Sequence, residues 1–130
     1  MIAPNEIEAI LITLKIDKNQ VLFILLTSDG TINRMGNGSA DCKDNNLYIG
    51  KTGTLPMISQ LRSMITPEMQ EFLHKTFDVP DKKGRTCELK ILLSNDKVET
   101  GVQFIYGEHS QGPPREFANV VRKAVELTEG

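Results

Sequence analysis

The stretch Cys87–Tyr106 reads CELKILLSNDKVETGVQFIY and shows the clearest pattern in this chain of 130 residues. Apolar and polar residues alternate on either side of Asn95-Asp96, as is typical of two β-strands that each bury one face. Pairing Leu93 with Val98 places both apolar stripes on the same face, because a slip of one residue would turn one stripe away. The stretch therefore predicts an antiparallel hairpin with one buried and one wet face.

The first part of the chain predicts more strands. Ile10, Ile12, Leu14 and Ile16 share one face of a first strand. Val21–Leu26 is apolar throughout, which suits a central strand covered on both sides, or covered on one side and tightly paired. Asp29-Gly30 is a hairpin-turn signal, but a two-residue turn there would pair Leu25 with Arg34. Either Arg34 lies on a wet face or this loop is longer. Leu47–Ile49 is a candidate short edge strand.

Helical patterns follow each group of strands. Ile58, Leu61 and Ile65 have helical spacing, and Thr66-Pro67 predicts a second helix with Thr66 as N-cap and Pro67 in its first turn. That helix would carry Met69, Phe72 and Leu73 on its apolar stripe, and the polar connector Asp78–Arg85 would end it. Pro113-Pro114 opens a strongly amphipathic last helix, whose apolar stripe comprises Phe117, Val120, Val121, Ala124, Val125 and Leu127. Arg122 and Lys123 toward its end match the helix dipole.

These patterns predict one α+β domain over residues 1–130, with the order β-β-β-(β)-α-α-β-β-α. We expect an antiparallel sheet of about five strands, with helices packed on one face. Runs of strands followed by helices favour this arrangement over alternating βαβ units with a parallel sheet.

Composition narrows the function classes. A net charge of −2 and a single basic cluster, Lys82–Arg85, argue against a nucleic-acid partner. The longest apolar run, Val21–Leu26, is far shorter than a membrane helix needs, so we expect no membrane partner. The N-terminus has no secretory-signal pattern, and Cys42 and Cys87 form no disulfide framework. The sequence thus predicts a soluble cytoplasmic protein.

Motifs for metals, nucleotides and nucleophilic catalysis are weak. Gly50-Lys51-Thr52 has Asn45 where a phosphate-binding loop requires glycine. His74 and His109 are the only histidines, and they show no zinc-like spacing. Cys87 falls on the apolar stripe of its strand, which indicates an inert core thiol. We therefore expect no metal and no cofactor.

One segment merits consideration as a site, the connector between the last strand and the last helix. Its polar or aromatic candidates are Tyr106, Glu108, His109, Ser110, Gln111 and Arg115. His109 could serve as an acid–base group oriented by Glu108, while Arg115 could hold an anion. The competing interpretation is a stiff connector in which His109 and Gln111 cap the helix.

Three hypotheses follow. The first is a non-catalytic binding or protein-interaction module, of a regulatory, inhibitor or immunity type, whose partner is another protein or a second copy of itself. Its candidate contacts are Leu92 and Ile105 on the outer face of the hairpin and the strand Leu47–Ile49. The second is a small ligand-binding protein or enzyme with its site at Tyr106–Arg115. The third is a scaffold subunit whose role is oligomerisation alone. We favour the first.

Overall fold

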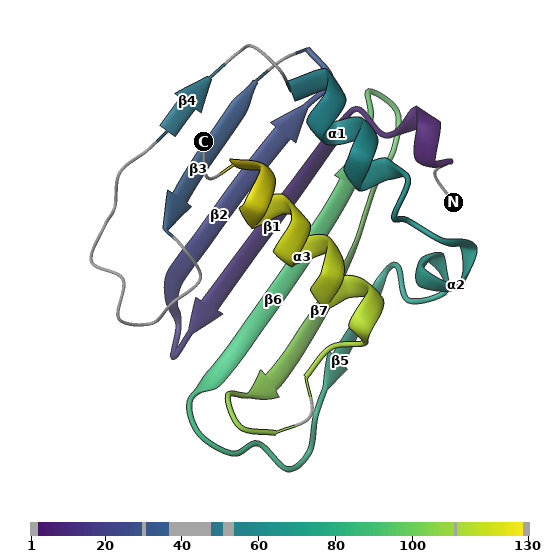
Figure 1. Ribbon diagram of the computed structural model, residues 1–130. Helices are drawn as coiled ribbons and strands as arrows, with labels where there is room; N and C mark the ends of the chain where they lie inside the picture. The colour runs from purple at the N-terminus through teal and green to yellow at the C-terminus, as the bar shows by residue number, and fades with distance from the viewer. Residues whose placement is uncertain (1–2, 30, 37–47, 51–53, 111, 129–130) are drawn as a thin grey trace.

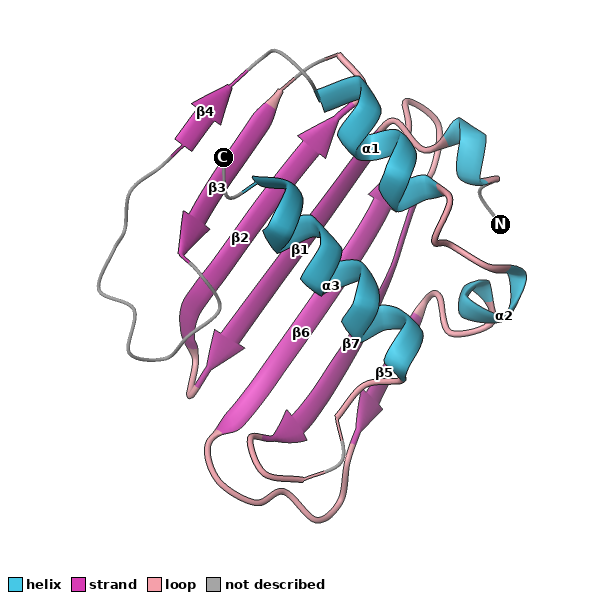
Figure 2. Cartoon of the chain, in the orientation of Figure 1, coloured by secondary structure: helices cyan, strands magenta, loops and turns pink. Residues whose placement is uncertain are grey.

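The computed structural model describes residues 3–29, 31–36, 48–50, 54–110 and 112–128, and it confirms the α+β class. The elements in chain order are η1 (Pro4–Glu6), β1 (Ala9–Ile16), β2 (Asn19–Thr27), β3 (Ile32–Gly36), β4 (Tyr48–Gly50), α1 (Thr54–Arg62), α2 (Pro67–Gln70), β5 (Lys75–Asp78), β6 (Thr86–Ser94), β7 (Glu99–Gly107) and α3 (Arg115–Thr128). Helices α1 and α3 lie on the same face of the sheet (Figures 1 and 2).

The sheet is larger than predicted, and it is mixed. Seven strands lie in the order β4-β3-β2-β1-β6-β7-β5, instead of about five antiparallel strands. All neighbours are antiparallel except β5 and β7, which run parallel. The expected order lacked β5. Lys75–Asp78 carries one apolar residue, Phe77, so it shows no strand periodicity of its own and depends on its neighbour β7 for pairing.

Strand β1 is central and joins two hairpins. It pairs with β2 on one side and with β6 on the other, so that Ile12 lies between Ile24 and Ile91. All three side chains are buried on the face that α1 and α3 cover. Asp17 and Lys18, both at positive φ, form the tight turn between β1 and β2, and such a turn matches the twist of the strands it joins.

The hairpin β6–β7 has the predicted faces, but its register is shifted by two residues. Leu93 pairs with Thr100, where the sequence predicted a pair with Val98. The turn is longer because the Asn95 side chain accepts hydrogen bonds from the backbone N–H groups of Lys97 and Val98, both at 2.8 Å. An asparagine turn of this kind is a local preference that the strand pattern does not reveal. Val98 consequently lies exposed.

The β2–β3 loop is also longer than two residues. Leu25 pairs with Asn33, and Arg34 pairs with Ile24. This shift of one residue turns the Arg34 side chain toward the face that carries the helices, where it reaches the end of α3. The predicted Leu25–Arg34 pair was therefore wrong, and the longer loop is the correct alternative. Most of the predicted loop Gly36–Asn46 lies outside the described residues.

The helices differ from prediction chiefly in length. Thr66 is the N-cap of α2, as predicted, and accepts a hydrogen bond from the N–H of Met69. Helix α2 ends at Gln70, however, because the next residues form turns that lead into β5. Ile65 lies beyond α1, although it is buried in the core. Of the short edge strand predicted at Leu47–Ile49, Leu47 lies outside the described residues and the remainder belongs to β4.

The core lies between the sheet and helices α1 and α3. Its helical contributors are Ile58, Leu61, Phe117, Val120 and Ala124. A group of four rings, Phe72, Phe77, Phe104 and Phe117, extends the core toward the β5 edge, with centroids 5.0–6.5 Å apart. Cys87 is buried as predicted, whereas Cys42 lies outside the described residues.

Candidate functional site

The segment between β7 and α3 lies against a second connector, the one that joins β5 to β6. The N–H of Glu108 donates to the carbonyl of Arg85, and the N–H of His109 donates to the carbonyl of Lys83, both at 2.8 Å. A Cβ atom on Gly107 would lie 2.2 Å from the backbone nitrogen of Lys83, so only glycine fits at this crossing. Two loops thus fix each other at the end of the sheet.

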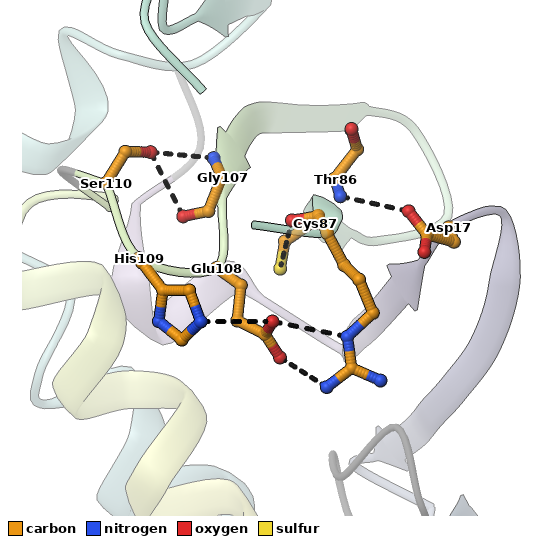
Figure 3. A network of polar contacts seen from close by, with 8 residues as sticks. Asp17, Thr86, Cys87, Gly107, Glu108, His109 and Ser110 are labelled. Atoms are coloured by element: carbon orange, nitrogen blue, oxygen red, sulfur yellow. Dashed lines mark hydrogen bonds and ion pairs between the residues drawn. The ribbon is translucent and has the colours of Figure 1, made fainter. Parts of the chain in front are cut away.

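Glu108 is held by an arginine as well as by the histidine predicted to use it. Arg85 donates from Nε and Nη2 to the two carboxylate oxygens at 3.2 and 2.5 Å, and His109 Nε2 lies 3.5 Å from Oε1 (Figure 3). Hydrogen bonding by Arg85 lowers the pKa of Glu108 below its ordinary value. The structure therefore brings Glu108 and His109 together, as an acid–base pair would require.

Other features of this group suit a connector better than a reaction centre. The His109 side chain is 72% exposed, so no wall excludes water from it. The Ser110 hydroxyl donates to the Gly107 carbonyl and accepts from the Gly107 N–H, and it therefore points into its own turn (Figure 3). Arg115 is exposed at the start of α3. Gln111 lies outside the described residues.

Cys87 borders this network, and its thiol is buried. Its sulfur is 3.8 Å from the carbonyl oxygen of Arg85 (Figure 3). Burial, and secondarily the charge of Glu108, raises the pKa of the thiol. A nucleophilic cysteine needs the opposite shift.

Three grooves adjoin the two connectors. A polar groove of about 400 Å³ lies between the loops and is lined by Val79, Pro80, Asp81, Lys83, His109 and Ser110. An aromatic groove of about 310 Å³ is lined by Phe72, Phe77, Asp78, Val79, Pro80, Phe104, Tyr106, Gly112 and Pro114. The third, which we call the α3 groove, measures about 350 Å³ and is lined by Leu14, Leu22, Leu89, Tyr106, Pro113, Ala118, Val121, Arg122 and Val125.

Tyr106 lines both the aromatic groove and the α3 groove. Burial raises the pKa of this phenol to about 12, with the neighbouring Cys87 as a lesser cause. Tyr106 is thus the residue of the predicted set that lies at apolar concave surface, while His109 and Ser110 line the polar groove. Arg115 belongs to none of these three linings.

Sequence reasoning missed the α3 groove because its lining comes from four strands, the β7–α3 connector and α3. A signal was nevertheless present in α3. Ala118, Val121, Arg122 and Val125 follow i, i+3, i+4, i+7 spacing and form a second stripe beside the buried one. Val121 and Val125 are only partly buried, which shows that the core does not use this stripe fully.

The face of the sheet opposite α1 and α3 is a second candidate surface. We call it the open face and define it by Leu11, Phe23, Leu25, Leu92 and Ile105. These residues alternate with the core positions of their strands, and all five are partly exposed. Leu11 pairs with Leu25 on one side and with Leu92 on the other, giving an apolar row across three strands. Leu92 and Ile105 are the contacts predicted for the hairpin's outer face.

No family model and no curated protein matches this chain. Over the part of the chain that the structure describes, no three His, Cys, Asp or Glu side chains gather as metal ligands would. None of the described helices combines the length and apolar character needed to cross a membrane.

Proposed function

We propose that the protein is a non-catalytic protein-interaction module that binds its partner through the open face. The observation that carries this proposal is the in-register row of Leu25, Leu11 and Leu92 on the face opposite α1 and α3. Contiguous apolar surface that remains accessible is characteristic of interaction sites. A broad sheet face suits another protein better than a small molecule, which binds in concave sites.

The arrangement around Gly101 supports the same surface. A Cβ atom there would lie 2.3 Å from Cδ2 of Leu92, so the leucine side chain occupies the space above this glycine. Leu92 therefore extends the apolar row onto β7. Lys90 and Glu88 lie at alternate positions of β6 on the same face as Leu92. They supply polar groups beside the row, as in interfaces with an apolar centre and a polar rim.

Strand addition at the sheet edges has less support. The edge strand β4 spans three residues and β5 spans four, and short edges offer few backbone hydrogen bonds to an incoming strand. An acid–base enzyme at His109 also has less support, because that side chain is largely exposed and its partner Glu108 is engaged by Arg85. The open face is therefore the better-supported binding surface.

The test compares three forms of the tagged protein in an extract of cells that produce it. The interface variant is Leu11→Lys with Leu92→Lys, and the control is Val98→Lys, which places the same charge at an exposed apolar residue of the β6–β7 turn. We expect native mass spectrometry to show the same second chain with wild type and control. Two charges in the contact should weaken that complex at least tenfold.

Circular dichroism of the three proteins checks that each one is folded. Equal capture of the same partner by a folded interface variant would overturn the proposal. A complex that contains only copies of this chain, lost in the interface variant, would identify the partner as the protein itself.

A further inference from the structure

The α3 groove is concave, apolar and large enough for a small molecule. Its sheet side carries Leu14, Leu22 and Leu89 from three neighbouring strands, and its helix side carries Val121 and Val125. A volume of about 350 Å³ falls within the range in which proteins hold small ligands. The groove lies on the helix side of the sheet, so it is separate from the open face.

The groove exists because α3 buries only one of its two apolar stripes. Phe117, Val120 and Ala124 are buried in the core, each at most 3% exposed. Val121 and Val125 lie beside that stripe and are only partly buried. Of the sheet leucines in the lining, Leu22 and Leu89 are at most 3% exposed and Leu14 is only partly buried. Leu14, Val121 and Val125 thus supply the apolar surface within reach of a ligand.

A cation lies in the lining of this apolar groove. The Arg122 side chain is exposed, and it forms no ion pair or hydrogen bond with any residue that the structure describes. Glu126 is the acidic residue one turn further along α3, and its Oε1 lies instead 3.8 Å from Nζ of Lys123. The guanidinium therefore remains available to an anion, which it can bind with two parallel hydrogen bonds.

Tyr106 provides a second polar group. Its hydroxyl has no hydrogen-bond partner among the described residues, although the side chain is partly buried against the core. With a pKa of about 12, the phenol stays protonated at neutral pH and can donate a hydrogen bond. Among the residues that the structure describes, the groove thus combines apolar walls with a cation that has no partner and a neutral donor.

We propose that the α3 groove binds a small acid with an apolar body, of the class of medium-chain carboxylates. The hydrocarbon part lies against Leu14, Val121 and Val125, and the carboxylate pairs with Arg122. Apolar contacts supply most of the affinity, while the charge pair discriminates an acid from a neutral analogue.

Decanoate, kept below its micellar concentration, is the probe, and decanol is its uncharged match. Isothermal titration should show that one decanoate binds per chain. Arg122→Gln should weaken decanoate binding by up to about fivefold and leave decanol binding unchanged, because exposed charge pairs contribute about 1 kcal/mol or less. Arg115→Gln is the matched control, since Arg115 is an exposed arginine of the same helix outside the groove lining.

A second pair of variants tests the groove itself. Ala118→Trp would fill the groove, and Asn119→Trp would add the same ring at the next, exposed position of α3. The site is supported if Ala118→Trp binds neither probe while Asn119→Trp binds both, provided that circular dichroism shows both variants to be folded. Absence of saturable decanoate binding to wild type would overturn the proposal. So would equal decanoate affinity of wild type and Arg122→Gln, or binding unaffected by Ala118→Trp.

Discussion

The Arg34 side chain on β3 donates a hydrogen bond from Nη1 to the carbonyl of Val125 in the last turn of α3, at 3.2 Å. The two residues are 91 positions apart in the sequence. The same nitrogen lies 3.3 Å from the Thr128 hydroxyl. The last turn of α3 contains no basic residue of its own. A cation from the sheet therefore satisfies one helix-end carbonyl and complements the negative end of the helix dipole.

Replacing Arg34 with methionine should lower the free energy of unfolding by about 1–2 kcal/mol, because it removes this charge and its hydrogen bonds while keeping an apolar stem. Urea denaturation measures the change. Arg122→Met, which removes a cation without a described partner from the same helix, should change stability by less than about 0.5 kcal/mol. Equal losses in the two variants would contradict the capping role.

Gln70 places a polar atom in apolar surroundings. Its Oε1 atom is buried and has no hydrogen-bond partner among the described residues. It lies beside a small cavity of about 10 Å³ lined by Met69, Leu73 and other apolar residues. Gln70→Leu should raise the free energy of unfolding by about 1 kcal/mol, because it removes an unsatisfied acceptor from apolar surroundings. Thermal denaturation would show this as a higher Tm. Gln60→Leu, at an exposed position of α1, should have little effect.

Ile12 and Leu11 are neighbours on opposite faces of β1, so they separate core packing from surface contact. Ile12→Ala should cost about 2–5 kcal/mol, because the side chain is fully buried. Leu11→Ala should lower the free energy of unfolding by about 1 kcal/mol, because the Leu11 side chain is partly exposed to solvent in the folded protein. Chemical denaturation of both variants measures the difference. A larger cost at Leu11 would mean that the open face is not available to a partner.

The Glu108–Arg85 ion pair predicts a defined pH dependence. The pKa of Glu108 is lowered in the folded state, so its contribution to stability is present above the unfolded pKa and is lost as pH falls through the folded pKa. The stability difference between wild type and Glu108→Gln should therefore shrink between about pH 5 and pH 3. Denaturation curves across this range test it. A difference that stayed constant to pH 3 would show that the carboxylate charge contributes nothing.

Cys87 should react slowly while the protein is folded, since it is 4% exposed and burial raises its thiol pKa. In a Cys42→Ser background, a thiol-reactive disulfide reagent should label Cys87 only as fast as the protein opens. The labelling rate should increase in urea in parallel with unfolding. Rapid labelling in native buffer would contradict the buried position.

Local patterns predicted strands with strong alternation and the faces they bury, because apolar periodicity is a property of each strand alone. Registers were harder to predict. The Asn95 side chain lengthens one turn, and Asp29 accepts from both the N–H and the hydroxyl of Thr31 in another. Each such loop shifts the strand pairing without changing the strand pattern.

The two candidate sites also differ in how far the sequence pattern could predict them. The outward positions of Leu92 and Ile105 were predictable, since alternation assigns them to the outer face of one hairpin. The α3 groove was not, because its lining brings Leu14 and Leu22 beside Tyr106 and Val121, from strands and a helix distant in sequence. Concave sites of this kind arise from tertiary packing, which a single sequence does not display.

The central place of β1 also has a consequence for biosynthesis. Its Ile12 finds its partner Ile91 only when β6 has been made. Because ribosomes add roughly 5–20 residues per second, β1 precedes that partner by roughly 4–16 seconds. Throughout this interval the nascent β1–β2 hairpin carries an unpaired, isoleucine-rich edge, so chaperones that shield exposed strands should associate with the emerging chain until β6 arrives.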